Sequence, residues 1–223
     1  MNEDQGSVSN TNAGKYSVVL SLLHVFQKIR AILHIILFLA SPSKPVIEKD
    51  IERWLELTHY DNYKRLPTWK GLIWLLWKYQ EYRNLFYYRI KKENRLISRV
   101  FLEVAKLFYA PMSTLYIRAM SIDEGLYVQH GYCTEISARS IGKNCWINQQ
   151  VVIGYSDEGK TPTIGDNVHI TAGAKVFGDI TIGNNSIIGA NAVVFKNVPP
   201  NCTVVGVPGY IVKRDDKKVK EPL

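Results

Sequence analysis

The chain has 223 residues and a mass of 25.5 kDa, enough to bury a core in one large domain or two small ones. Hydrophobic residues make up 46% of it and charged residues 22%, which excludes disorder of the whole chain. Residues 1–120 carry 18 basic and 10 acidic side chains, so they hold the entire net charge of +8. No aromatic and basic recognition motif accompanies this surplus, and we expect no nucleic-acid partner.

The cysteines are Cys133, Cys145 and Cys202. Their odd number and the absence of CxxC spacing argue against a disulfide framework and against a structural zinc site. We therefore expect a reducing compartment and no bound metal.

Residues 1–16 are polar and are predicted to form a disordered leader. In residues 17–40, six apolar side chains recur at helical spacing, and they are Phe26, Ile29, Ile32, Leu33, Ile36 and Leu37. This pattern predicts an amphipathic helix that packs on the protein or, less favoured, lies on a membrane surface. Lys28 and Arg30 leave an uncharged stretch shorter than the roughly 20 residues of a membrane span. The stretch also starts too late for a typical signal peptide. We expect a cytoplasmic protein, with peripheral contact to the inner membrane surface as an option.

Residues 46–109 keep the helical period, and Pro67 and Pro111 interrupt it. Three apolar stripes are predicted core faces: Ile47, Ile51, Trp54 and Leu55; Ile73, Leu76, Trp77 and Phe86; and Ile97, Val100, Phe101, Val104, Leu107 and Phe108. About four helices result, and residues 17–120 are predicted to form an α-helical domain.

From Ile141 onward the period changes to six. Aliphatic residues stand at 141, 147, 153, 164, 170, 176, 182, 188 and 194, and the single break in phase predicts that the loop from Tyr155 to Thr161 bulges out. The third residue after each aliphatic one is mostly Asn or Gly, the types that tolerate the left-handed backbone region. The chain is therefore predicted to turn a corner every six residues, as a β-solenoid does. Spacing fixes neither the number of sides nor the hand, and right-handed crossovers are the general expectation.

The segments IGKNCW, IGDNVH, ITAGAK and IGANAV resemble the hexapeptide repeats of the left-handed β-helix acyltransferases. With GLYVQHG, TPTIG and YQEYRNLFYYR, the chain is similar to the serine acetyltransferase branch over about residues 65–214. The resemblance implies an α+β fold, with the α-helical domain followed by a left-handed parallel β-helix over residues 121–212 and a charged tail over residues 213–223. It further implies acetyl-coenzyme A (acetyl-CoA) as donor and a homotrimer with active sites between subunits. The helical domain is a candidate for joining two trimers.

Transfer of an acetyl group to a hydroxyl needs a base near neutral pH, and histidine is suited to that role. His130 lies in VQHG, where the resemblance places the catalytic histidine, and it is the predicted general base. The cysteines match no nucleophile position of the family, so no acyl-enzyme is expected. His169 is predicted to point out of the solenoid, either into the acceptor side of the cleft or simply at the surface.

Coenzyme A requires small residues along its pantetheine arm and cations near its phosphates. By resemblance, Gly154, Ala172, Gly173 and Ala190 meet the arm. Lys196 and Lys213 are the matching cations near the nucleotide.

The acceptor side departs from the serine enzymes. Gln129 replaces the acidic residue before the histidine, residues 63–77 contain no Asp or Glu, and Thr161 replaces a second histidine. These changes favour a neutral acceptor, which we expect to be a sugar of a surface polysaccharide or its precursor, free or lipid-linked. The alternative is serine O-acetylation for cysteine biosynthesis. A third interpretation is a trimeric scaffold without catalysis.

Overall fold

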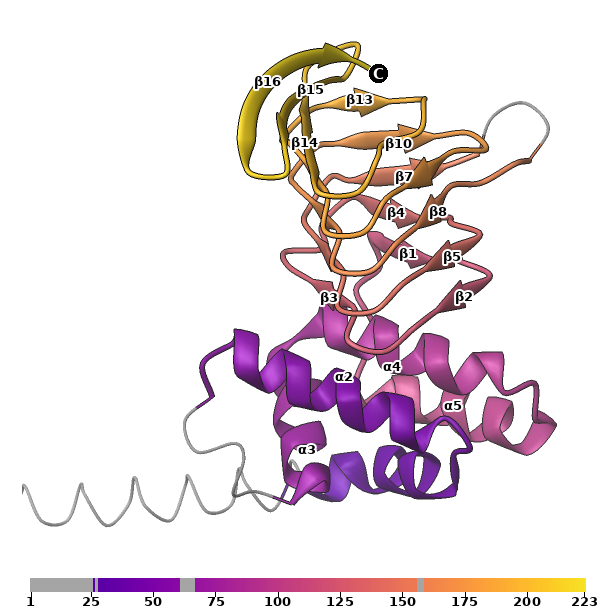
Figure 1. The fold of residues 1–223 in the computed structure, drawn as a ribbon. Coiled ribbons are helices and arrows are strands. Elements are labelled where there is room, and N and C mark those ends of the chain that lie inside the picture. Colours follow the sequence, from indigo (N-terminus) through magenta and orange to yellow (C-terminus); the bar gives the residue numbers. More distant parts are fainter. Residues whose placement is uncertain (1–25, 27, 61–66, 156–158) are drawn as a thin grey trace, which may run out of the picture.

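The computed structural model describes residues 26, 28–60, 67–155 and 159–223. Helices gather at one end of the molecule, and a stem of short stacked strands rises from them (Figure 1). The predicted leader, residues 1–16, lies outside the described part, as do the central residues of the predicted loop after Tyr155. The fold is α+β, with the helical region first and the solenoid after it, as predicted.

The helices are α2 (Lys44–Leu57), α3 (Thr68–Lys78), α4 (Gln80–Lys92) and α5 (Leu96–Phe108), and residues 28–40 are helical as well. The first predicted stripe is confirmed, because Ile47, Ile51, Trp54 and Leu55 are all buried on α2. Gly71 lets α3 approach this face closely, since a Cβ there would lie 2.7 Å from Cδ1 of Leu55. Of the second stripe, Ile73, Leu76 and Phe86 are buried.

The third stripe is not a core face in the described chain. On α5 only Leu102 and Ala105 are buried, whereas the stripe residues Ile97, Val100, Phe101, Val104, Leu107 and Phe108 are exposed, as is Trp77 of the second stripe. Phe26, Ile29, Ile32 and Ile36 of the first predicted helix are exposed too. An amphipathic pattern reports an apolar face but not what covers it. The expected membrane contact and cytoplasmic location stay predictions.

The stem has three sheets. Sheet A contains β1 (Leu115–Ile117), β4 (Thr134–Ile136), β7 (Val152–Gly154), β10 (Lys175–Phe177) and β13 (Val193–Val194). Sheet B contains β2 (Ser121–Ile122), β5 (Ser140–Ile141), β8 (Thr163–Ile164) and β11 (Thr181–Ile182). Sheet C contains β3 (Tyr127–Val128), β6 (Trp146–Ile147), β9 (His169–Ile170), β12 (Ile187–Ile188) and β14 (Cys202–Val205), followed by β15 (Tyr210–Arg214) and β16 (Lys217–Pro222).

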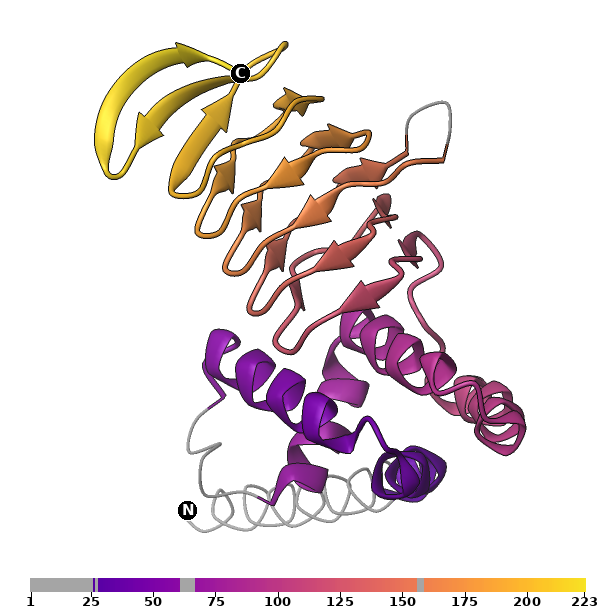
Figure 2. The same cartoon turned by 45° about the vertical axis from the view of Figure 1, so that its right-hand side comes forward.

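Consecutive coils pair in parallel with one strand directly above the next, as the turned view shows (Figure 2). The aliphatic residues of the six-residue period are buried at every one of the nine predicted positions. The solenoid is a left-handed parallel β-helix, so the general expectation of right-handed crossovers was wrong here. That rule rests on a crossover that packs back onto its own sheet, whereas these connections are short corners.

The corners differ from one another. Asn144, Asn167 and Asn185 have positive φ where sheet B passes to sheet C, as predicted, and Gln150, Gly173 and Asn191 do so between sheets C and A. At the third corner the prediction was wrong, because Gly178 rather than Asp179 has positive φ, and Asn197 does not have it. The side chain of Asn197 instead accepts a hydrogen bond from the backbone N–H of Thr181 at 2.8 Å.

At the two ends, the strands extend beyond the predicted stem. β1 pairs with β4 ahead of residue 121, and the predicted charged tail contains the end of β15 and all of β16. Among the described residues, no helix combines the length and the apolar content needed to cross a membrane.

A buried ion pair joins the helical region to the first coil. The guanidinium of Arg89 on α4 donates to both carboxylate oxygens of Asp50 on α2, at 2.9 and 3.2 Å, and to the carbonyls of Ile122 and Asp123. Asp50 also accepts the N–H of Gly125 at 2.7 Å. The chain segment that leads to His130 is thereby fixed to two helices.

Candidate active site

His130 lies at the corner where the first coil passes from sheet C to sheet A, between β3 and β4. Its φ is 54° and its side chain is exposed. Among the described residues, no hydrogen bond to its imidazole is found. The next residue is closely packed, because a Cβ on Gly131 would lie 3.0–3.1 Å from side-chain atoms of Leu115, Glu81 and Val128. The corner therefore offers a free imidazole on a tightly packed support.

A carboxylate that the sequence analysis did not single out lies against this corner. Oε1 of Glu81, in the first turn of α4, accepts the backbone N–H of Gly131 at 3.3 Å. Glu81 belongs to the YQEYR segment, directly after the stretch that was searched for acidic residues. The helical region thus supplies one carboxylate that contacts the residue after the predicted base.

Backbone hydrogen bonds continue from the His130 corner along one edge of the stem, which we call the His130 edge. Gln150 N–H donates to the carbonyl of Tyr132, Gly173 N–H to that of Gln149, and Asn191 N–H to that of Ala172, at 2.9–3.0 Å. Each coil contributes one level to this edge, from Tyr132 at the first level to Asn191 at the fourth. Three coil steps separate these two levels, or about 14 Å at the usual strand spacing.

Three of the predicted donor-binding residues lie on this edge. Ala172 and Gly173 stand at its third level and Ala190 at its fourth. Gly173 has a φ of +74°, and a Cβ there would lie 2.0 Å from Oδ1 of Asn191. Beyond His130, the edge therefore consists of turning backbone, with small residues at its third and fourth levels. The assignment of these residues to coenzyme A stays a prediction.

Gln129 belongs to a chain of three polar side chains beside the base. Its Oε1 accepts a hydrogen bond from Nδ2 of Asn148 at 2.9 Å, and Oδ1 of Asn148 lies 2.9 Å from Nε2 of His169. The His169 ring stacks on Trp146, with centroids 4.9 Å apart. Burial lowers the pKa of His169 below its ordinary value. His169 thus points outward as predicted, and Asn148 connects it to Gln129, a residue of the predicted acceptor side.

Two other predicted residues lie away from the His130 edge. Gly154 ends β7 of sheet A and packs against the ring of Phe177. Thr161 lies just before β8, a strand of sheet B. Within a single chain, Thr161 and Gln129 therefore lie at different sheets of the stem.

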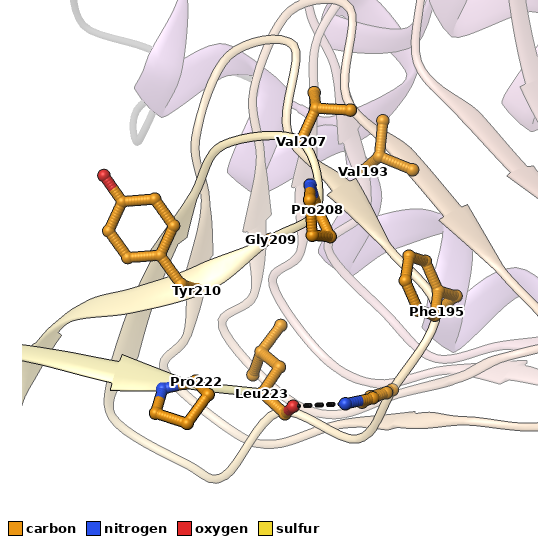
Figure 3. A pocket seen from close by; sticks show the side chains of 9 residues that line it. Val193, Phe195, Val207, Pro208, Gly209, Tyr210, Pro222 and Leu223 are labelled. Carbon is orange, nitrogen blue, oxygen red and sulfur yellow. Dashed lines mark hydrogen bonds between the residues drawn. The ribbon is translucent and has the colours of Figure 1, made fainter.

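The predicted cations already have protein partners. Nζ of Lys196 donates to the carbonyl of Leu223 at 2.6 Å, and Lys213 pairs with Asp216 at 2.8 Å. Lys196 also lines a cavity of about 450 Å³ at the far end of the stem, together with Phe195, Pro208 and Leu223 among others (Figure 3). A nucleotide would have to compete with these exposed contacts.

No group of three or more His, Cys, Asp or Glu side chains is placed to hold a metal ion in the part of the chain that the structure describes. Cys145 and Cys202 are buried and Cys133 is exposed. Burial raises the pKa of the Cys145 thiol to about 12, which suits a core residue rather than a nucleophile.

Comparison with known proteins bears on this geometry. The family model described as bacterial transferase hexapeptide (six repeats) matches residues 161–196. A serine acetyltransferase from Staphylococcus xylosus is 41% identical over 134 residues, which is 58% of this chain and 60% of that protein. A serine acetyltransferase from Staphylococcus aureus is 48% identical over 102 residues, 44% of this chain and 48% of that protein. The chain carries the hexapeptide repeat and resembles the serine acetyltransferases.

This serine acetyltransferase-like chain spans about half to three fifths of the length of those curated relatives. Among solved structures, the serine acetyltransferase of Brucella abortus has a TM-score of 0.59 at 23% identity and covers 86% of this chain and 75% of its own. The Neisseria gonorrhoeae serine acetyltransferase in complex with serine has a TM-score of 0.52 at 28% identity, over 74% of this chain and 67% of its own. The likeness to the Brucella protein concerns the fold alone.

Proposed function

We propose that the chain is an O-acetyltransferase that uses acetyl-CoA, with His130 as its general base. The single observation that carries this proposal is the position of His130, exposed and unpaired among the described residues at the head of an edge lined by Ala172, Gly173 and Ala190. The similarity to serine acetyltransferases supports the same chemistry.

In this reaction the acceptor hydroxyl loses its proton to the imidazole of His130 while its oxygen attacks the thioester carbonyl carbon. The carbon–sulfur bond then breaks, and the imidazolium returns the proton to the departing thiolate. A neutral histidine near pH 7 can carry out both transfers. No acyl-enzyme is required, because the acetyl group moves directly from sulfur to oxygen.

Serine is the first candidate acceptor, ahead of the sugar that Gln129 and Thr161 favoured. The curated relatives that match the chain are serine acetyltransferases. The argument for a neutral acceptor also rested on the absence of Asp and Glu from residues 63–77. Glu81, just beyond that stretch, places a carboxylate against Gly131. In the proposed site, this carboxylate is the candidate partner for an ammonium group on the acceptor.

A sugar hydroxyl remains the second candidate because of the uncharged pair that Gln129 and Asn148 form beside the base. A non-catalytic scaffold ranks third, since a scaffold has no need of an exposed imidazole at this corner.

Release of free coenzyme A from acetyl-CoA, measured with serine and with a panel of sugars, separates the three interpretations. We expect serine to be turned over with a specificity constant of at least about 10⁴ M⁻¹s⁻¹, an ordinary enzyme value. Faster turnover of a sugar would replace serine by the second candidate. Absence of turnover with every acceptor would leave the scaffold.

We further propose that the protein is a homotrimer whose stems meet side by side. Gln129 and Thr161 lie on different sheets of one chain, so a site that uses both requires a neighbouring stem. Large apolar side chains of the stem are also exposed, among them Tyr116, Tyr132, Tyr155 and Phe195, and contact between subunits is one way to cover them.

Sedimentation velocity at micromolar concentration is expected to give three times the chain mass of 25.5 kDa, or six times if the helical regions join two trimers. A species of one chain mass that turns over acetyl-CoA would contradict the shared site, because that site needs a second stem.

A further inference from the structure

Gln129, Asn148 and His169 form two successive side-chain hydrogen bonds, which determine how the Gln129 amide is oriented. Register explains the contact: Tyr127, Trp146 and His169 stand one above another on β3, β6 and β9. Gln129 and Asn148 each lie two residues past the strand residue of their own coil, on the same outward face. His169 contacts Asn148 of the preceding coil, and Asn148 contacts Gln129 of the coil before that.

The protonation of His169 sets the donor and acceptor roles in both hydrogen bonds. The ring is neutral near pH 7, because burial lowers the pKa of His169, and a neutral imidazole carries one N–H. Oδ1 of Asn148 lies 2.9 Å from Nε2, and because an amide oxygen only accepts hydrogen bonds, we infer that the proton is on Nε2. The Asn148 amide then has its NH₂ group toward Gln129 and donates to Oε1 of that residue at 2.9 Å.

With Oε1 engaged, Gln129 has its own NH₂ group left for a ligand. An amide NH₂ donates hydrogen bonds and accepts none. On the other side of His130, Glu81 offers only acceptor oxygens. The residue before His130 thus presents a donor, and the residue after it, Gly131, is in contact with an anion.

We propose that Asn148 and His169 are positioning residues that orient the Gln129 amide, so that the site selects an acceptor carrying both an oxyanion and an ammonium around its hydroxyl. The Gln129 amide binds the carboxylate of a hydroxy amino acid, and Glu81 binds its ammonium. This inference rests on the proposed acetyltransferase function with serine as acceptor, and it adds Asn148 and His169 as the residues that orient the acceptor side.

The test compares three acceptors that share a primary hydroxyl. They are L-serine, ethanolamine, which lacks the carboxylate, and 3-hydroxypropionate, which lacks the ammonium. For the unmodified protein we expect serine to have a kcat/KM about 10- to 100-fold above either analogue, the usual effect of one hydrogen bond to a charged group.

Two variants then change the hydrogen bonds that orient the Gln129 amide, at residues that do not contact the reacting atoms. Asn148→Asp cannot donate to Gln129, so the Gln129 amide must turn over and present its oxygen. We expect the serine-to-ethanolamine ratio of kcat/KM to fall about 10-fold or more. His169→Phe keeps the stack on Trp146, removes the N–H and adds no charge. We expect His169→Phe to lower the serine-to-ethanolamine ratio of kcat/KM several-fold. Because this variant introduces no charge, such a fall cannot be attributed to a charge effect of the kind that Asn148→Asp could cause.

Asn184→Asp is the matched control. Its Oδ1 only accepts a hydrogen bond, from the N–H of Asp166 at 2.9 Å, which a carboxylate does equally well. An unchanged ratio in both Asn148→Asp and His169→Phe would overturn the proposal. A protein that turns over none of the three acceptors before any substitution would instead overturn the proposed amino-acid acceptor, and this inference with it.

A readout independent of turnover is the ¹⁵N NMR spectrum of histidine-labelled protein, in which the His169 signals are assigned by their loss in His169→Phe. We expect the Nε2–H tautomer at neutral pH. The Nδ1–H tautomer would reverse the donor and acceptor roles in both hydrogen bonds and overturn the proposal.

Discussion

Replacing His130 by asparagine is expected to lower kcat about 10²- to 10⁴-fold, because asparagine cannot take the acceptor proton. Asparagine is the appropriate substitution, since His130 has a φ of 54° and asparagine tolerates the left-handed region. The KM for acetyl-CoA should stay nearly unchanged, because the predicted donor-binding residues lie beyond this side chain. Steady-state kinetics with the better acceptor of the panel measures both quantities.

His59→Asn is the matched control for this experiment. His59 is also exposed and has a φ of 52°, but it lies after α2, in the helical region. We expect wild-type kinetics from this control. A rate for His130→Asn within about threefold of wild type would remove His130 from the role of general base, since such bases contribute at least about 100-fold.

The stem was largely predictable from the sequence because its period is local. Each coil repeats the same demand for an aliphatic residue inside and a turning residue at the corner, so Ile147, Ile170 and Ile188 identify the interior directly. The third corner was mispredicted, since Gly178 takes the positive φ that the period assigns to Asp179.

The surroundings of His130 could not be read from spacing in the same way. Glu81 meets Gly131 across 50 positions of sequence, through the packing of α4 against the first coil. Asn148 meets Gln129 across 19 positions and His169 across 21. These separations depend on the length of each coil, including the loop that lengthens one of them. Sequence patterns indicated that His169 points outward, whereas only the coil register shows which side chain it meets.

The apolar stripe of α5 marks a different limit. Periodicity correctly gave an amphipathic helix, but the described chain covers only the side with Leu102 and Ala105. The opposite side stays exposed, with Leu107 at 83% of its full accessible area. A single sequence does not show whether such a face is buried within its own chain or by another molecule.

The largest effect on stability is expected from Arg89→Ala. Arg89 and Asp50 are only 6% and 2% exposed in their side chains, so removing the guanidinium leaves a carboxylate buried without its counter-charge. The carbonyls of Ile122 and Asp123 lose a donor as well. Breaking a buried pair in this way costs about 3–5 kcal/mol. Urea unfolding at one fixed protein concentration measures the loss, because assembly contributes to apparent stability.

Arg214→Ala is the control for Arg89→Ala, because Arg214 pairs with Glu221 in a half-exposed setting where a salt bridge contributes at most about 1 kcal/mol. If Arg89→Ala costs no more than this control, the pair does not hold the helices to the first coil. If it costs the expected amount, adding Asp50→Asn should recover part of the loss, since the double variant no longer buries an unpaired charge. That recovery would separate the cost of the orphaned carboxylate from the cost of the lost carbonyl contacts, which the double variant still lacks.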